Sequence, residues 1–278
     1  MAYKTILVHC NDKRRIDALL APTLTLAGAF QSHVVGLSVV PPATVIATGA
    51  LGAPPVLVDA HCELYRQEVP IMRQRFDAAM AGKPVTAEWR DAEPGSFGVI
   101  GTVLEHGRTA DLIVANQTDD DWPATEWLDI ADRVAVESGR PTLIVPNGRT
   151  EARVGQRVLV AWNGSREAAR AAFDALPVLQ RAAAVNIVSI GEGDGDQSER
   201  SIVDICDALQ RHGVKAKRAQ PIAAQVGAGP ALIEQADAFA ADLVVMGCYG
   251  HSRLREFILG GASRHILDKM RVPVLMSH

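Results

Sequence analysis

Short apolar runs alternate with longer amphipathic segments along the whole chain. The runs are rich in Val, Ile and Leu with little polar alternation, which is typical of strands buried on both faces of a parallel sheet. The amphipathic segments place apolar residues three and four positions apart, the spacing of one helix face. This order predicts an α/β fold in which helices cover both faces of a parallel sheet.

The first half of the chain contains five predicted strands and four predicted helices. The strands are Thr5–His9, Val34–Val40, Val85–Trp89, Leu112–Ala115 and Thr142–Val145. The helices are Ile16–Phe30, Leu57–Ala81, Val99–Glu105 and Asp129–Ser138. Pro70 is expected to kink the second helix. The apolar segment Pro41–Pro55, broken by Gly and Pro, is predicted to be a loop.

The second half repeats this order. Its predicted strands are Arg157–Trp162, Ala184–Ile190, Val214–Ala219, Leu243–Met246 and Pro273–Met276. Its predicted helices are Ser165–Ala182, Ser198–His212, Pro230–Phe239 and Ala262–Met270. The acidic, glycine-rich segment Gly191–Gln197 is predicted to be a loop.

Parts of the two halves match residue for residue, which indicates an internal duplication. The run that begins at Thr5 (TILV) corresponds to the run at Arg157 (RVLV), and the run at Ala110 (ADLIV) corresponds to the run at Ala241 (ADLVV). The polar segment Asn147–Gln156 separates the repeats. We therefore predict two doubly wound, five-stranded domains, residues 1–149 and 150–278, packed as an internal pseudo-dimer.

Composition narrows the class of protein. A net charge of −4 argues against a general nucleic-acid binder, which would need a basic surface. No apolar run approaches the roughly 20 residues of a membrane span. The four cysteines are scattered without metal-site spacing, which suits a reducing compartment. The chain enters a strand pattern directly after Met1, without a signal-peptide pattern, so we expect a cytoplasmic protein.

The segment Asp242–Ser263 carries the clearest chemical signal. An apolar run ends at Gly247, further glycines follow at Gly250, Gly260 and Gly261, and an amphipathic segment then begins. A strand, a glycine-rich loop and a helix start form a common anion site, because glycines allow close backbone approach and the helix presents unpaired N–H groups. The matching place in the first half holds Asp119–Asp121, which would repel a phosphate.

Two interpretations of this segment remain open. In the functional one, a phosphate-bearing ligand is bound by backbone and side chains of twelve residues: Ala161, Trp162, Asn163, Met246, Gly247, Gly250, His251, Arg253, Gly260, Gly261, Ala262 and Ser263. Among these, Met246 and Ala161 to Asn163 would border the base and sugar, with Arg255 and Arg264 as further charge partners. In the other interpretation, the glycines only permit a tight return of the chain over the sheet edge.

With these glycines at the spacing G-x2-G-x9-G, the chain resembles a tandem member of the bacterial universal stress protein family. The resemblance covers both halves and implies ATP or a related adenine nucleotide as ligand, as well as pairing of the last strands of the halves. Two positions depart from the pattern: Gly261 replaces Ser or Thr, and Asn163 replaces an acidic residue, as does Asn11 in the first half. Each lost polar contact would cost about 0.5–1.5 kcal/mol.

Several other side chains have competing interpretations. His251 and His265 could contact phosphate or simply bond to backbone, and we expect His9 and His33 to be packed or edge residues without metal spacing. Cys248 could be an oxidisable thiol or a small buried side chain.

No catalytic constellation is visible, so at most slow ATP hydrolysis is expected. The main alternative is a non-nucleotide interaction protein that engages a partner through Pro41–Pro55 and Trp122–Trp127. An adenylyl-transferring enzyme is a third interpretation. Further pairing of chains into a homodimer is left open.

Overall fold

In the computed structural model, described residues are 2–41, 44–46, 56–58, 60–119, 121, 128, 130–148, 152–189, 195–219, 227–248 and 261–278. The strands are β1 (Thr5–His9), β2 (His33–Val39), β3 (Thr44–Ile46), β4 (Val56–Val58), β5 (Thr86–Ala92), β6 (Leu112–Asn116), β7 (Thr142–Val145), β8 (Arg157–Trp162), β9 (Ala184–Ser189), β10 (Ala216–Arg218), β11 (Leu243–Gly247) and β12 (Val274–Ser277). The helices are α1 (Ile16–Phe30), α2 (Ala60–Met80), α3 (Gly98–Gly107), α5 (Ala131–Glu137), α6 (Arg166–Asp174), α7 (Leu176–Leu179), α8 (Gly195–Arg211), α9 (Ala228–Ala238) and α10 (Gly261–Lys269).

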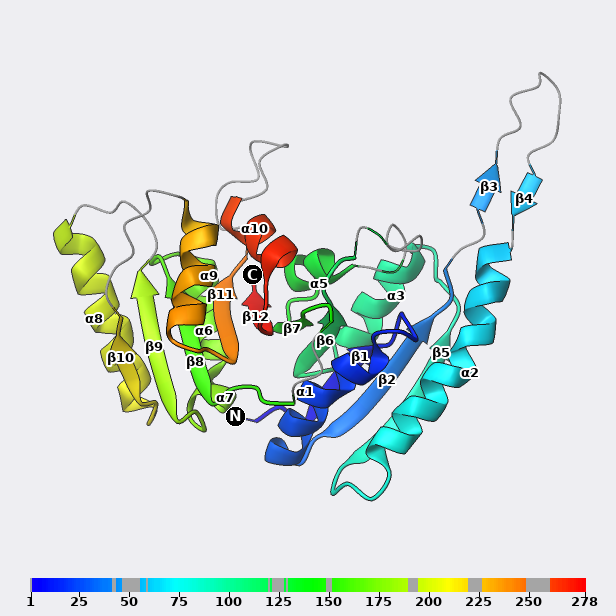
Figure 1. Ribbon diagram of the computed structural model, residues 1–278, viewed down its shortest axis with the longest axis horizontal. Coiled ribbons are helices and arrows are strands. Elements are labelled where there is room, and N and C mark those ends of the chain that lie inside the picture. The colour runs from blue at the N-terminus through cyan, green and yellow to red at the C-terminus, as the bar shows by residue number, and fades with distance from the viewer. Residues whose placement is uncertain are drawn as a thin grey trace.

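Ten of the strands form one continuous sheet with the order β10-β9-β8-β11-β12-β7-β6-β1-β2-β5 (Figure 1). Each half contributes five parallel strands in the same relative order. The halves join where β7 and β12 pair antiparallel, with Leu143 opposite Leu275. This confirms the predicted α/β fold with two five-stranded halves and the predicted pairing of the last strands.

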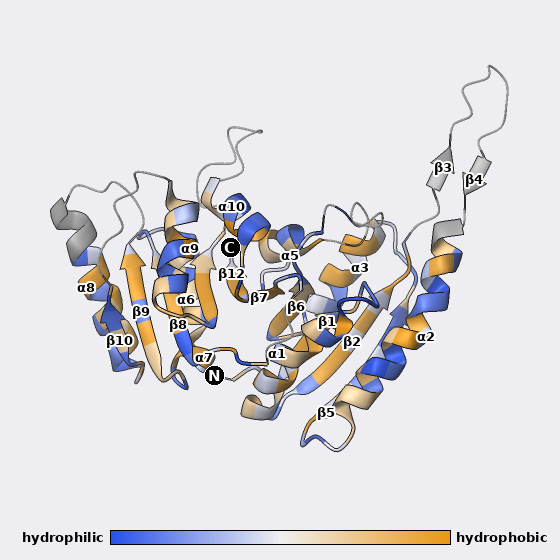
Figure 2. Ribbon diagram, in the orientation of Figure 1, coloured by the Kyte–Doolittle hydropathy of each residue, from blue (hydrophilic) through white to orange (hydrophobic). Residues whose placement is uncertain are grey.

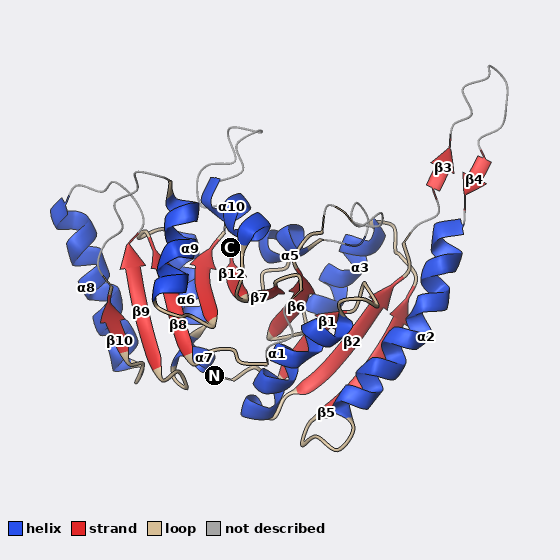
Figure 3. Ribbon diagram, in the orientation of Figure 1, coloured by secondary structure: helices blue, strands red, loops and turns tan. Residues whose placement is uncertain are grey.

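Helices cover both faces of this sheet (Figure 3). In the first half, α1 packs on α2 and α3 packs on α5; in the second half, α6 packs on β8 and β11, while α9 packs on α10. The central strands β6 and β7 are wholly buried and mostly apolar, and Figure 2 shows the sheet mainly in the hydrophobic colour. Burial on both faces explains why these strands appear in the sequence as unbroken apolar runs.

Two predicted elements are corrected in detail. The single helix predicted over Ser165–Ala182 is two helices, α6 and α7, because Pro177 stands in the first turn of α7. A proline lacks a backbone N–H and its ring clashes with the preceding turn, so α6 cannot continue through it. The acidic segment predicted as a loop is helical from Gly195 onward.

The predicted loop Pro41–Pro55 is also wrong in part. Thr44–Ile46 pairs antiparallel with Val56–Val58, with Val45 opposite Leu57, so a two-stranded ladder leads out of the body of the protein (Figure 1). Pairing satisfies backbone groups that an irregular chain would leave to water. As a result α2 begins at Ala60 and not at Leu57.

Candidate functional site

The carboxyl ends of β8 and β11 lie side by side in the second half. These strands pair directly, with Leu243 opposite Val158 and Val245 opposite Val160. Their other neighbours, β9 and β12, lie on opposite sides, so the strand order reverses direction here. Open α/β sheets bind ligands at such a switch point, beyond the carboxyl ends of the strands. The fold therefore brings the predicted residues after β8 and at the end of β11 to one place.

The turn after β8 is held by its own side chains. The Asn163 Oδ1 atom accepts a hydrogen bond from the Ser165 N–H at 3.0 Å. The Ser165 hydroxyl in turn accepts one from the Ala168 N–H at 3.1 Å and caps α6. Gly164 has a φ of 73°, a conformation in which glycine is favoured. Asn163 and Gly164 are exposed, so the turn presents polar groups at the switch point.

Gly247 is required by packing, independently of any ligand. A Cβ atom at this position would lie 2.5 Å from the backbone N of Ala168 and 2.5 Å from the backbone C of Glu167. The glycine therefore lets the first turn of α6 lie directly on the end of β11. Close approach of this kind explains one glycine of the predicted loop without a phosphate.

Helix α10 begins at Gly261, the last glycine of the predicted site. Gly261 is exposed, Ala262 is half-buried and Ser263 is buried. No heavy atom of the described chain lies within 4 Å of a Cβ built on Gly261, so packing does not demand glycine there. The remaining predicted loop residues lie outside the described residues: Gly250, His251, Arg253, Arg255 and Gly260.

The strand residues of the predicted site differ in exposure. Ala161 and Met246 are buried and pack in the same core cluster as Leu232 and Ile266. Trp162 is half-buried, and its indole N–H donates to the Ser201 hydroxyl at 2.9 Å. The turn residues that follow β8 are therefore more open to a ligand than the residues of the strand itself.

The matching switch point in the first half is filled by protein side chains. The Asn116 amide donates to Asn11 Oδ1 at 2.8 Å, and the Asn11 amide donates to the Leu128 carbonyl at 2.8 Å. All three residues are buried. Asn11 corresponds to Asn163, so asparagine at this position is buried in the first half and exposed in the second.

A second layer of polar groups closes this site. The Arg15 guanidinium donates to Asp12 at 2.7 Å and to the Gln117 carbonyl at 2.7 Å. Burial opposes charge on Asp12, but hydrogen bonds from Arg14 and the charges of Arg14 and Arg15 outweigh it and lower the pKa of this carboxyl. Asp119, which we expected to repel phosphate, lies 3.4 Å from the Arg14 guanidinium. The first-half switch point therefore differs from the second-half one mainly because protein side chains occupy it, and less because acidic residues there would repel a phosphate.

Sequence reasoning missed Arg15, Asn116 and Gln117. The only signal was that polar residues directly follow two apolar strands, Thr5–His9 and Leu112–Ala115, at ends that meet in a parallel sheet. Nothing in their spacing showed that they would bond to one another.

The remaining candidate side chains are structural in the described chain. Cys248 is buried, and burial raises the pKa of its thiol to about 12, so it is a poor nucleophile. His265 packs on Gly229, whose added Cβ would lie 2.7 Å from the His265 Cβ. His9 is buried, and His33 at the start of the inner strand β2 bonds to the Thr86 hydroxyl at 2.9 Å.

Metal-ion clusters and membrane-spanning helices are both absent from the described residues. No group of three or more His, Cys, Asp or Glu residues there could hold a metal ion. None of the described helices combines the length and apolar character needed to cross a bilayer.

Comparison with known proteins relates the second half of the chain to a protein family. Residues 155–278 match the universal stress protein family. Over 147 residues the chain is 27% identical to Universal stress protein Slr1230 of Synechocystis sp. (strain ATCC 27184 / PCC 6803 / Kazusa), a match that covers 52% of this chain and 49% of that protein. The match thus spans about half the length of the curated relative.

Solved structures extend the similarity to the whole fold. A universal stress protein from Archaeoglobus fulgidus DSM 4304 superposes with a TM-score of 0.71 at 14% identity, covering 98% of this chain and 95% of that chain. A Pseudomonas aeruginosa UCBPP-PA14 protein of the same family name superposes with a TM-score of 0.60 at 17% identity, covering 99% and 93%. The chain therefore contains a universal stress protein family domain in its C-terminal half, within a fold shared over its full length with solved proteins of that name.

Proposed function

We propose that this chain is a tandem universal stress protein whose C-terminal half binds ATP, a related adenine nucleotide or another phosphate-bearing ligand. In this proposal both halves derive from the family domain, and only the second keeps a ligand site. The protein acts in the cytoplasm as a ligand-gated stress effector and not as a dedicated enzyme.

The difference between the two switch points carries this proposal. In the first half, Asn11, Asn116 and Gln117 are buried and bonded within the protein, so a ligand would have to displace them. In the second half, Asn163 and Gly164 are exposed beside the end of β11. A site that is open in one copy of a duplicated fold and filled in the other supports binding in the open copy alone.

Helix α10 supplies the attraction for an anion. Its first residue, Gly261, is exposed, and the first N–H groups of a helix have no partner within the helix. These groups and the helix dipole together favour phosphate. Asn163 would contribute hydrogen bonds to the sugar or base from the neighbouring strand end.

Hydrolysis has no evident base in the described part of the site. Glu167 lies in the first turn of α6, directly after the turn that follows β8, and the Arg166 guanidinium donates to its carboxylate at 3.0 Å. Burial opposes its charge, but the hydrogen bond from its own backbone N–H and the pairing with Arg166 lower its pKa. A carboxylate that is already bonded as an anion is a weak proton acceptor, so binding is the proposed activity.

A thermal-shift titration with ATP, together with native mass spectrometry of freshly purified protein, tests the proposal. We expect bound nucleotide or an ATP-dependent rise in melting temperature, and loss of both in Gly260→Asp. Gly28→Asp is the matched control, because Gly28 is exposed in α1 and has open space at its Cβ position. The absence of any shift at millimolar ATP, or an equal shift in Gly260→Asp, would contradict nucleotide binding.

A second candidate is an interaction protein without a nucleotide. The β3–β4 ladder favours it, because it forms a separate two-stranded sheet that projects from the body of the protein (Figure 1). Replacing residues 42–58 by a short Gly-Ser linker should then abolish binding of a protein partner or a second copy without changing the thermal stability of the body. Unchanged oligomeric state and partner capture after this replacement would count against it.

A further inference from the structure

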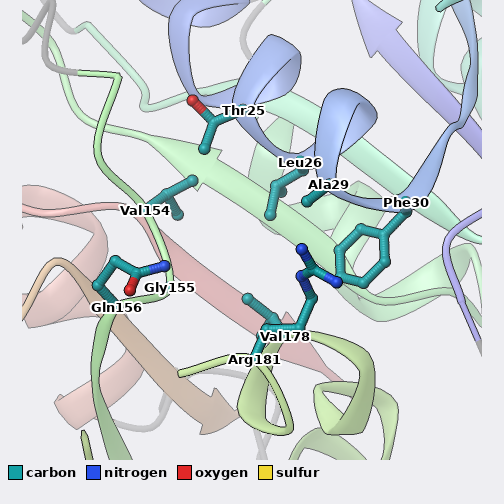
Figure 4. Close-up of a pocket in the computed structure, with 9 residues that line it drawn as sticks. All are labelled: Thr25, Leu26, Ala29, Phe30, Val154, Gly155, Gln156, Val178 and Arg181. Atoms are coloured by element: carbon teal, nitrogen blue, oxygen red, sulfur yellow. The ribbon is translucent and has the colours of Figure 1, made fainter. Parts of the chain in front are cut away.

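A cavity of about 330 Å³ lies where the two halves of the chain meet (Figure 4). Its lining comes from α1, from the segment before β8 and from the region of α7: Thr25, Leu26, Ala29, Phe30, Val154, Gly155, Gln156, Val178 and Arg181. Gln156 directly precedes β8, and Phe30 ends the helix that leads into β2. The cavity is therefore at the amino ends of the strands, at the opposite edge of the sheet from the candidate phosphate site.

The floor of this cavity is apolar and well packed. Leu26, Phe30, Val154 and Val178 are all buried. The hydroxyl of Thr25 at the rim is already used, since it donates to the Ala152 carbonyl at 2.7 Å. An apolar floor with polar groups at the rim is typical of small-molecule sites.

One wall is fixed by a glycine that packing requires. Gly155 has a φ of 80°, and a Cβ there would lie only 2.3 Å from Val178 Cγ2. The backbone of the segment between the halves therefore packs directly against α7. The cavity is preformed, and it exists only because both halves and the segment between them are in place.

Arg181 gives the cavity its charge. In Figure 4 the guanidinium reaches across the mouth toward Phe30, and its carbon lies 5.7 Å from the ring centroid. This contact is within cation–π range. No carboxylate of the described chain forms an ion pair with Arg181. The ammonium of Lys4 donates to the Phe30 carbonyl at 2.9 Å.

We propose that this cavity binds a small organic monoanion with an apolar body, of the class of aromatic or short-chain carboxylates. The carboxylate pairs with Arg181, and the body packs on Leu26, Phe30 and Val178. The volume is at the small end of the range of roughly 300–1,000 Å³ for ligand sites. One arginine at the mouth suits one negative charge and not a triphosphate.

A titration of the intact chain with benzoate, benzylamine and benzyl alcohol tests this proposal. These probes share the ring and differ in charge. In amide chemical-shift spectra, benzoate should perturb the resonances of Ala29, Gly155 and Gln156 at lower concentration than the other two. ATP should not displace it, because the candidate nucleotide site is at the other edge of the sheet.

Arg181→Gln should weaken benzoate binding by about tenfold, as expected for loss of a charge-assisted hydrogen bond, and leave benzyl alcohol unaffected. Arg211→Gln removes an arginine from the end of α8 and should change neither. Arg181 is exposed, so its variant should fold. Equal affinity for benzoate and benzylamine in the native protein, no binding of benzoate, or unchanged benzoate binding by Arg181→Gln would overturn the proposal.

Discussion

The side-chain amide of Gln117 in the first half donates a hydrogen bond to the backbone carbonyl of Leu267 in the second half, at 2.7 Å. The same nitrogen lies 3.0 Å from the Asp268 carbonyl, and Gln117 Oε1 accepts from the Asn147 N–H at 2.9 Å. The last carbonyls of a helix have no hydrogen-bond donor within the helix, and the Gln117 amide is the donor for two of them in α10. The filled switch point of one half is thereby bonded to the helix that starts at the candidate site of the other.

Gln117→Leu should lower the free energy of unfolding by about 2–3 kcal/mol, because it leaves carbonyls of α10 and the N–H of Asn147 without a partner in a partly buried place. Urea denaturation measures this change. Gln180→Leu is the control, since Gln180 makes one exposed hydrogen bond, to the His212 carbonyl at 2.9 Å. A loss no greater than that of Gln180→Leu would show that the contact between the halves is weak.

Asn163→Asp should strengthen ATP binding by about three- to tenfold, the effect of one regained charge-assisted contact. Asn163 is exposed, so the new carboxylate stays in water when no ligand is bound. Isothermal titration calorimetry measures the affinity.

Asn11→Asp is the matched change in the first half, with a different expected result. Asn11 is buried and its amide donates to the Leu128 carbonyl, and a carboxylate would instead place two acceptors face to face. Stability should fall by about 1–3 kcal/mol with no gain in binding. If Asn11→Asp improves ATP binding and Asn163→Asp does not, the assignment of the open site to the second half is wrong.

Gly247→Ala should destabilise the protein by about 1–3 kcal/mol, because the added methyl group overlaps the backbone of Glu167 and Ala168, which cannot move aside as a side chain can. Gly261→Ala should be neutral or stabilising by up to about 1 kcal/mol, because its Cβ position is open and alanine favours a helix. Thermal denaturation compares the two.

Gly261→Ser extends this comparison to binding. Serine restores the hydroxyl at the start of α10, so ATP should bind more tightly to Gly261→Ser than to Gly261→Ala, again by about three- to tenfold for one hydrogen bond. Equal affinities would show that phosphate does not reach this end of the helix.

Stability should fall in mild acid because of His9. Burial, with a smaller effect from the charge of Arg15, lowers the pKa of this histidine from 6.5 to about 3. Between these values the unfolded chain binds the proton and the folded chain does not. The contribution of His9 is therefore full above pH 6.5 and is lost as the pH falls toward 3, which amounts to about 2 kcal/mol between pH 7 and pH 5.

His9→Leu should remove this part of the pH dependence, which urea denaturation at the two pH values would show. Leucine is close to histidine in size and does not titrate. The matching position in the second half is Ala161, so an apolar side chain is compatible with this place in the fold. An unchanged difference in stability between pH 7 and pH 5 would mean that other groups control the acid response.

The order of strands and helices, the duplication and the pairing of the last strands could all be predicted from the sequence and its resemblance. Strands buried on both faces have continuous apolar runs, and helices have apolar residues three or four positions apart. Both patterns lie within short stretches of sequence, so they can be recognised without the fold. The break between α6 and α7 could also have been predicted from a local signal, Pro177. The β3–β4 pairing was not, because Gly and Pro break this apolar segment and its two short strands pair only in the folded chain.

For the candidate site, the amino-acid sequence alone showed that only the second half carries the glycines, and the resemblance added that Gly261 and Asn163 depart from the family pattern. The state of the matching place in the first half became visible only in the folded chain, where protein side chains fill it. Asn11 and Asn116 are 105 residues apart and bond only because β1 and β6 are neighbours in the sheet. The role of Gly247 likewise depends on where the first turn of α6 lies. Hydrogen bonding and close packing join residues far apart in sequence, so the fold must place the partners before either can be recognised.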